Sequence, residues 1–365
     1  MARISVQDIR CILVTRLRFL GDVVLSTPLV RALRQTFPKA HLAYLSEQPY
    51  GEVLEHNPHL NEVIALDRKE IASFPLARRA FAHAGFFKRL RKENFDLVID
   101  LLGNPRSGLL SFLTGAKIRF GPARRGRAIY YTHLVAEPNR SHTQIETHLE
   151  FLKFLGMDPY KADPKTEIFV SNREKTWAFS YLAENRLVSH PLILLHPGAS
   201  WPAKRWLPER FAQIATRLQR DLKASTVLLC GPNEQGMTSE VLQAMRGKLH
   251  VAEGLTIRQL TALLSKCDLF ITNDAGPMHI ACALGRPTLA LFGPGDPQTW
   301  FPYPLNDKQV AIHQPPSCWP CHLDVCEPLD CMKAITADEV TEKAKELLAL
   351  PLQPTPRNPK VLCPT

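Results

Sequence analysis

Short apolar runs alternate with longer amphipathic stretches along almost the whole chain. Val, Ile and Leu dominate the runs, whereas the stretches between them repeat their apolar positions at helical spacing. This alternation predicts strand-helix-strand units, in which helices cover both faces of a parallel sheet. In the first half we predict strands at 9–16, 41–46, 62–67 and 96–102, and helices at 22–36, 76–93, 104–114 and 143–156.

The second half repeats the pattern after a mixed linking segment at 157–190. A stretch rich in Pro and Cys follows at 294–332. The fold class we predict is α/β, with two Rossmann-like, doubly wound parallel-sheet domains that face a central cleft; the domains span 1–175 and 176–335, before a C-terminal helix and tail at 336–365. The second-half strands are expected at 192–196, 225–230, 249–252, 268–272 and 287–292, and the helices at 208–220, 235–246, 256–266, 277–285 and 336–350.

Charge and hydropathy limit the function classes. The net charge is +10, and a basic loop at 119–127 carries four arginines, which keeps a nucleic-acid-binding protein as an alternative of a different class. No nucleic-acid-binding module is recognisable, and the charges are dispersed along the chain. No segment approaches the ~18 apolar residues of a membrane span. Arginines bracket the apolar run 11–14 too closely for a signal peptide, so we expect a cytoplasmic protein.

Motifs that would identify a dinucleotide or nucleoside triphosphate site are missing from the sequence. There is no G-x-G-x-x-G turn, no G-x-x-x-x-G-K-[ST] loop and no D-x-D pair to hold a divalent cation against a sugar diphosphate. A diphosphate ligand would therefore have to be neutralised by Lys, Arg, His and helix N-termini.

A first candidate segment lies where the first strand ends and a helix begins. Gly21 permits a tight turn there, and Asp22 stands at the expected helix start. Asp22 is either a helix cap or a general base directed into the cleft.

A second candidate segment, 195–208, follows the first strand of the second half. It contains Gly198, the adjacent cations Lys204 and Arg205, and two tryptophans. The two cations are either solvated surface charges or anion ligands, and their place at the carboxyl end of a strand favours phosphate binding.

A third segment joins a buried strand to a helix N-terminus. Gly276, Met278 and His279 are positioned to donate backbone N–H groups to a phosphate, and Asp274 to accept sugar hydroxyls. An N-cap aspartate and a structural histidine explain the same residues equally well.

Two further residues lie at the ends of neighbouring strands. Gly293 allows close backbone approach to a ligand, or only a tight turn. Glu234 is positioned to accept a ribose hydroxyl pair, with a helix N-terminal acid as the ordinary explanation.

Together these segments resemble glycosyltransferase family nine, the lipopolysaccharide heptosyltransferases, most closely those of type II. The resemblance rests on R-x-x-x-x-G-D-V-V-L-S-T-P, H-P-G-A-x-x-x-A-K-R-W and T-N-D-A-G-P-M-H, followed by R-P-T-L-A-L-F-G-P. It implies a GT-B fold and inverting, metal-independent transfer of heptose from ADP-heptose to a lipid A/Kdo or heptose acceptor of the inner core. The alternative within the fold is another nucleotide-sugar transferase or an epimerase.

The resemblance also implies roles for individual residues. Asp22 would take the proton of the acceptor hydroxyl, Lys204 and the N–H groups from Gly276 onward would stabilise the departing diphosphate, and Asp274 would hold the heptose. His279 would lie close to the phosphates and Glu234 near the adenosine ribose. Family members often carry Ser or Thr where this chain has Ala275, which removes one hydroxyl from the expected phosphate site.

Four of the nine cysteines form a cluster, Cys318-x2-Cys321-x4-Cys326-x4-Cys331. The spacing is compatible with zinc or an iron-sulfur centre, but also with a compact loop of reduced thiols, because it departs from paired C-x-x-C knuckles. No cofactor besides the donor is expected, and metal at this cluster stays open.

The expected partners are a nucleotide-sugar donor, an anionic glycolipid acceptor and the inner face of the inner membrane, with no nucleic acid. The helix at 76–93 carries basic residues with Phe81, Phe86 and Phe87. Either it faces the membrane surface or it packs its aromatic rings inward and exposes only its charges.

Overall fold

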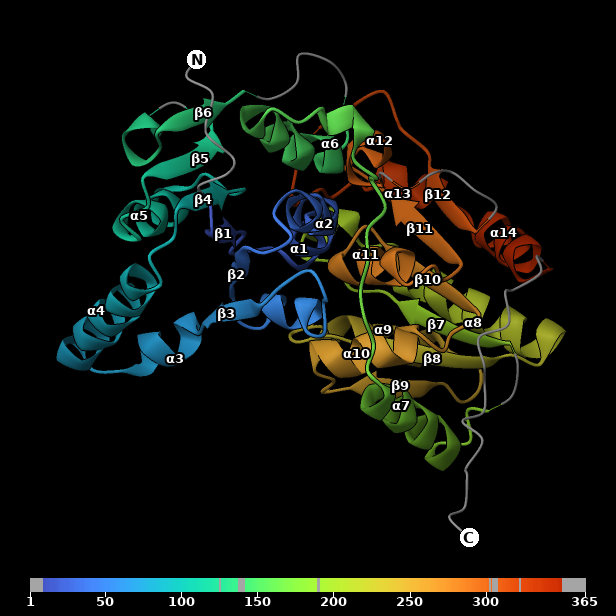
Figure 1. Ribbon diagram of the computed structural model, residues 1–365. Coiled ribbons are helices and arrows are strands. Elements are labelled where there is room, and N and C mark those ends of the chain that lie inside the picture. Colours follow the sequence, from blue (N-terminus) through green and yellow to red (C-terminus); the bar gives the residue numbers. More distant parts are fainter. Residues whose placement is uncertain are drawn as a thin grey trace, which may run out of the picture.

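The structure, a computed structural model, describes residues 9–124, 126–136, 142–188, 191–301, 303, 308–321 and 323–349. Within this part of the chain there are two six-stranded parallel sheets, flanked by helices (Figure 1). The predicted α/β class with two doubly wound domains is confirmed. Three parts of the predictions lie outside the described residues: residues 1–8 of the first domain, Arg125 of the basic loop, and residues 350–365 of the C-terminal tail.

The first sheet has the strand order β3-β2-β1-β4-β5-β6. Its strands are β1 (Cys11–Thr15), β2 (His41–Glu47), β3 (Glu62–Leu66), β4 (Leu97–Asp100), β5 (Ile118–Pro122) and β6 (His133–Val135). The helices of this half are α1 (Leu20–Leu25), α2 (Thr27–Thr36), α3 (Arg68–Ser73), α4 (Leu76–Lys92), α5 (Pro105–Leu113) and α6 (Gln144–Leu149), with the 3-10 helix η2 at Tyr50–Leu54.

The second sheet has the order β12-β11-β10-β7-β8-β9, which is the same winding as in the first sheet. Its strands are β7 (Leu192–His196), β8 (Ser225–Cys230), β9 (His250–Glu253), β10 (Leu269–Asn273), β11 (Thr288–Phe292) and β12 (Gln309–His313). The helices are α7 (Asn172–Glu184), α8 (Pro208–Leu222), α9 (Gln235–Ala244), α10 (Ile257–Leu264), α11 (Gly276–Ala283), α12 (Pro297–Trp300), α13 (Asp330–Ala334) and α14 (Ala337–Ala349).

Successive residues of the central strands enter different cores. In β1, Ile12 and Val14 belong to a core shared by both domains, whereas Leu13 between them belongs to a separate core on the other face of the first sheet. In β10, Phe270 likewise enters the shared core and Ile271 the outer core of the second sheet. Side chains alternate across a strand, so these continuously apolar strands are buried on both faces.

The shared core joins the two domains through α1 and α11, which pack against each other between the two sheets (Figure 1). Val23 and Val24 of α1 and Met278 and Ile280 of α11 are fully buried there. The helices that directly follow β1 and β10 therefore form the central contact between the two halves.

Several predicted boundaries were wrong. The helix expected at 22–36 is two helices separated at Ser26, because Pro28 lies in the first turn of α2 and cannot continue the preceding helix. α1 also begins earlier than predicted, at Leu20, which places Gly21 inside the helix and not in a turn. The helix expected at 143–156 is α6 followed by a 3-10 helix at Glu150–Leu155, which Gly156 caps.

Among the described residues, three strands and four α-helices were missed, namely β5, β6, β12, α3, α7, α12 and α13. The predicted basic loop at 119–127 begins as strand β5, in which Arg119 donates to the carbonyl of Tyr130 at 2.8 Å. Strands β6 and β12 were also unpredicted, since both are short and lie beside Pro-rich or polar segments. Helix α7 lies inside the segment read as a linker, and its capping box, Ser171 with Glu174, is a start signal that the sequence does contain.

The two ends of the second half have clear packing partners. α7 packs against α10, and the predicted domain boundary at residue 175 lies inside α7. α14 packs against α8, and its Val340 and Ala344 enter the outer core of the second sheet. The domain limits as a set stay a prediction.

Candidate functional site

The winding of the two sheets identifies where a ligand would bind. In each sheet the strand order reverses direction at one point, between β1 and β4 in the first and between β7 and β10 in the second. Ligands of doubly wound sheets bind outside the carboxyl ends of the strands at that point. Asp22, Lys204 and Asp274, all predicted site residues, lie in segments that directly follow β1, β7 and β10.

Asp22 is the third residue of α1, and only 7% of it is exposed. Its Oδ2 accepts the backbone N–H of Phe19 at 3.1 Å, so the predicted capping contact is present. Its Oδ1 lies 2.5 Å from a guanidinium nitrogen of Arg16, whose other nitrogen donates to the carbonyl of Leu101 at 2.6 Å. Arg16 therefore fixes the carboxylate against the end of the first sheet.

Gly21 provides space for the second domain. A Cβ at this position would lie 2.5 Å from Cδ2 of His279, so only glycine lets α1 approach α11 this closely. The tight turn predicted for Gly21 is wrong, and the reason for glycine is this contact. It brings the first candidate segment directly against the third.

His279 is a buried neutral group. Burial lowers its pKa to about 4, Asp274 and Asp22 partly oppose this, and Lys204 adds to the lowering. Its Nδ1 forms a hydrogen bond of 2.9 Å with the hydroxyl of Tyr303. At neutral pH the imidazole brings no positive charge to the site.

Lys204 and Asp274 are in contact. The ammonium Nζ of Lys204 lies 2.6 Å from Oδ2 of Asp274, and the two side chains are 18% and 6% exposed. Nζ also lies 4.8 Å from the ring centroid of Trp201. An ammonium has three N–H donors, so Lys204 is able to hold Asp274 and a phosphate oxygen at the same time.

The other predicted diphosphate ligands, Arg205, Met278 and Gly276, differ in whether their N–H groups already have a hydrogen-bond partner in the protein. Arg205 donates from Nε to the carbonyl of Ala199 at 3.0 Å, within its own loop. The N–H of Met278 donates to the carbonyl of Ala275 at 3.0 Å and is therefore already paired, and the Met278 side chain is buried. Gly276 is the first residue of α11, where backbone N–H groups point along the helix axis.

Glu234 forms a second polar cluster beside Lys204's loop. Nε2 of His196 donates to Glu234 at 3.1 Å, and the N–H of Gly231 donates at 2.7 Å. Burial alone raises the pKa of Glu234, but the hydrogen bond and charge of His196 and the Gly231 N–H outweigh it and hold the pKa below its ordinary value. A Cβ at Gly198 would lie 1.9 Å from Oε1 of Glu234, so this glycine makes room for the carboxylate.

Gly293 likewise packs against protein atoms. A Cβ there would lie 2.7 Å from the sulfur of Met332 and 3.1 Å from the carbonyl of Ala203. Sequence reasoning expected a glycine for a turn or a ligand at all three glycine positions. The structure shows that each one lets another part of the chain come close.

Sequence reasoning missed three residues that hold the site together. Arg16 pairs with Asp22, and Tyr303 contacts His279. Asn273, which is fully buried, donates to the carbonyl of Pro197 at 2.7 Å and accepts the N–H of Trp206 at 3.1 Å, so it fixes both ends of the Lys204 loop. Asn273 directly precedes Asp274, and Arg16 begins the motif that contains Gly21 and Asp22, so the sequence offers a signal for both. It offers no signal for Tyr303.

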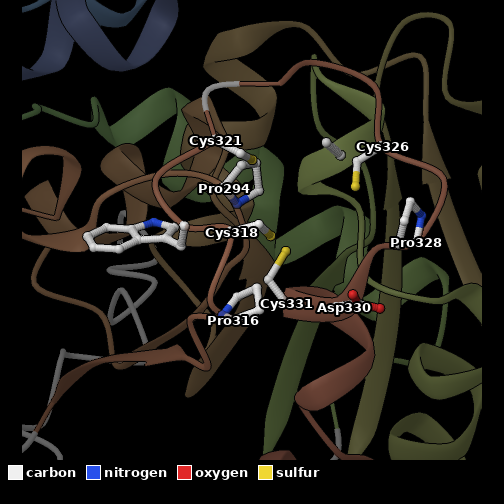
Figure 2. A pocket seen from close by; sticks show the side chains of 10 residues that line it. Pro294, Pro316, Cys318, Cys321, Cys326, Pro328, Asp330 and Cys331 are labelled. Carbon is white, nitrogen blue, oxygen red and sulfur yellow. The ribbon is translucent and has the colours of Figure 1, made fainter.

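One group of potential metal ligands lies outside this site. Among the described residues, ligand atoms of Glu55, His56 and Glu174 lie within 4.8 Å of one another. Arg258 already donates to both carboxylate oxygens of Glu174, at 2.6 and 2.8 Å, so the guanidinium already neutralises the charge of this carboxylate. The four clustered cysteines, in contrast, line a single pocket (Figure 2).

Comparison with known proteins now decides the family. The sequence profile of glycosyltransferase family 9 (heptosyltransferase) matches residues 83–329. The chain belongs to this family. It is similar to lipopolysaccharide heptosyltransferase 3 of Escherichia coli K12, with 28% identity over 306 residues, 80% of this chain and 84% of that protein. As a family 9 member the chain is a glycosyltransferase, and the predicted enzyme class is confirmed.

Solved structures of this family share the fold. The family 9 glycosyltransferase of Veillonella parvula aligns over 95% of this chain and 99% of its own, with 26% identity and a TM-score of 0.80. The ADP-heptose lipopolysaccharide heptosyltransferase II of E. coli aligns over 93% of this chain and 98% of its own, with 23% identity and a TM-score of 0.73. The predicted GT-B fold is confirmed by these matches.

The aromatic residues of the basic helix α4 divide between its two interpretations. Phe86 and Phe87 pack against the outer core of the first sheet, and Phe81 is 80% exposed. Arg89 lies 2.5 Å from Glu62. In the described part of the family 9 chain, no helix combines the length and the apolar character needed to cross a membrane.

Proposed function

We propose that this chain transfers heptose from ADP-heptose to the inner core of lipopolysaccharide, with inversion at the anomeric carbon and without a metal ion. The observation that carries the proposal is the α1–α11 contact, where His279 packs against Gly21 and lies within electrostatic reach of Asp22, of Asp274 and of Lys204. One domain thereby supplies a carboxylate and the other a cation and a helix N-terminus. The family match and the names of the relatives support the donor and the acceptor class.

In the proposed mechanism Asp22 removes the proton of an acceptor hydroxyl. The oxygen attacks the anomeric carbon of heptose from the face opposite the diphosphate, the bond from that carbon to the diphosphate oxygen breaks, and ADP leaves with both electrons. Arg16 holds the Asp22 carboxylate in position for this step. A positioned carboxylate base contributes about 10²–10⁴-fold to such a reaction.

The leaving group would be stabilised by Lys204 and by the N-terminus of α11 at Gly276. Neutral His279 would add a hydrogen bond but no charge, so Lys204 would be the main group that neutralises the diphosphate. Asp274, held by Lys204, would accept heptose hydroxyls, and Glu234 would accept those of the adenosine ribose. Arg205 would add positive charge at the edge of the donor site.

The acceptor of this reaction is an anionic glycolipid, lipid A with Kdo or heptose, so the proposed place of action is the cytoplasmic face of the inner membrane. The +10 net charge supports association with such a surface.

The test is a reconstituted reaction with ADP-heptose and a Kdo-containing lipid acceptor, followed by mass spectrometry of the acceptor. ADP release that depends on the acceptor, together with an added heptose, supports the proposal. ADP-heptose consumed without acceptor, or converted to an isomer, would instead identify a hydrolase or an epimerase.

Asp22→Asn tests the base within the same assay. We expect kcat to fall about 10²–10⁴-fold while ADP affinity stays close to wild type, because the amide keeps the shape but not the basicity. Asp338→Asn, which removes a surface partner of Arg217, is the matched control and should retain full activity. Unchanged kcat in Asp22→Asn would exclude Asp22 as the base.

A further inference from the structure

The strongest feature that the proposed function leaves unused is the segment between β12 and α13. Residues 314–321 and 323–329 contain no helix or strand, yet this segment carries Cys318, Cys321 and Cys326 and ends just before Cys331. All four cysteines line one pocket of about 200 Å³ (Figure 2). Separated by up to 13 positions in the sequence, the thiols line the same pocket. Among the described residues no three of their sulfurs lie within 4.8 Å of one another, so a shared ion would draw them closer together.

The chemistry of the pocket is that of a soft-metal site. Its remaining walls are Ala203, Trp319, Asp330 and three prolines, so sulfur is the dominant ligand atom. Figure 2 shows the sulfurs of Cys318 and Cys331 directed toward each other and that of Cys326 directed into the same space. Four thiolates are the usual ligands of tetrahedral zinc or iron.

The pocket is also connected to the Lys204 loop. The N–H of Ala203, the residue before Lys204, donates to the carbonyl of Asp324, which lies between Cys321 and Cys326, at 3.0 Å. Ala203 itself lines the thiol pocket, and Met332 packs under Gly293. Any ion that orders the cysteine segment therefore also fixes the backbone that carries Lys204.

We propose that Cys318, Cys321, Cys326 and Cys331 bind one zinc or iron ion in tetrahedral thiolate coordination, and that this ion holds the Lys204 loop in place. The ion has a structural role in this proposal and takes no part in the transfer reaction. The first half of the proposal is independent of the proposed function, and only the effect on Lys204 rests on it.

The test measures metal directly. Full-length protein purified without oxygen is analysed for zinc and iron by mass spectrometry, and its absorption spectrum separates iron–thiolate bands from colourless zinc. We expect about one equivalent of one metal, and less than about 0.2 equivalents in Cys318→Ser and Cys326→Ser. Cys11→Ser, a matched change in the first sheet, should keep the metal. Metal-free wild-type protein, or variants that retain the metal, would overturn the proposal.

A thiol titration keeps the test valid if the cysteine variants do not fold. A mercurial reagent added to native wild-type protein should release the metal as it modifies thiols. Release without thiol modification, or a Cys318–Cys331 disulfide found in the anaerobic protein, contradicts the site. ADP affinity of the metal-depleted protein then tests the link to Lys204: weaker binding supports it, and unchanged binding limits the ion to the cysteine segment.

Discussion

At the scale of single residues, the site combines charges that are paired before any ligand arrives. Asp22 is held by Arg16, and Asp274 by Lys204. Breaking a buried pair by removing one partner leaves an uncompensated charge, so each pair acts as a unit. The paired arrangement lets this polar centre lie in the contact between two domains, with Asp22 and Asp274 only 7% and 6% exposed.

Lys204→Ala should weaken ADP binding by about 10–100-fold, because a charge-assisted hydrogen bond to phosphate is worth about 1.5–3 kcal/mol. The reliance on Lys204 is greater here because Ala275 offers no hydroxyl. Calorimetric titration with ADP measures the effect, and Lys39→Ala, an exposed lysine of the first domain, is the control. Equal affinities for Lys204→Ala and wild type would remove Lys204 from the phosphate site.

Two buried histidines make stability depend on pH. Burial lowers the pKa of both His148 and His279 from 6.5 to about 4. Between these values the unfolded chain binds more protons than the folded one, so the free energy of unfolding falls as the pH drops from 6.5 to 4. Each imidazole contributes about 1.4 kcal/mol per pH unit in that window.

His148→Gln tests this dependence. Urea denaturation at several pH values between 4.5 and 7.5 should show a slope that is shallower by about 1.4 kcal/mol per pH unit than in wild type. The slope is compared, not the absolute stability, because the change also alters the hydrogen bond between His148 and the carbonyl of Leu25. His41→Gln, a change at a ring that is 42% exposed, is the control. Identical slopes in the His148 variant and wild type would contradict the prediction.

At the scale of elements, the hydrophobic pattern predicts the helices and strands that are long and buried. The central strands β1, β4, β7 and β10 are continuously apolar and were located within a few residues. Edge strands such as β6 and β12 are short and partly exposed, so their alternation is too weak to detect. Asp22, Lys204 and Asp274 were identifiable because they follow central strands. The ion pair between Lys204 and Asp274 was not identifiable, since the two residues are 70 positions apart and come together only through the winding of the sheet.

The α1–α11 contact depends on the missing side chain of Gly21. Gly21→Ala should lower the free energy of unfolding by about 1–3 kcal/mol, because its Cβ would collide with the buried ring of His279. Gly85→Ala is the matched control: it lies within helix α4 with no atom near its added Cβ, and should stabilise by about 0.5–1 kcal/mol. If both variants are stabilised, α1 and α11 have space for the added methyl group at residue 21, and the prediction is wrong.

At the scale of the whole molecule, the two halves are joined at a second place besides α1 and α11. Arg258 of α10 is 8% exposed and pairs with Glu174 of α7. It also donates to the carbonyl of Phe169 at 2.7 Å and reaches the carbonyls of Glu52 and Val53 in η2, both at 3.4 Å. One guanidinium thus links the second domain, the connecting segment and the first domain.

Arg258→Met should lower the free energy of unfolding by about 3–5 kcal/mol, whereas Arg217→Met, which breaks the surface pair with Asp338, should change it by less than about 0.5 kcal/mol.

Burial alone raises the pKa of Glu174, but hydrogen bonds from Arg258 and Ser171 bring it from 4.5 to about 2. This pair therefore stabilises the fold fully above pH 4.5 and loses its contribution as the pH falls toward 2. The stability difference between wild type and Arg258→Met should accordingly shrink between pH 5 and pH 3. A constant difference would show that Arg258 acts through its carbonyl contacts and not through Glu174.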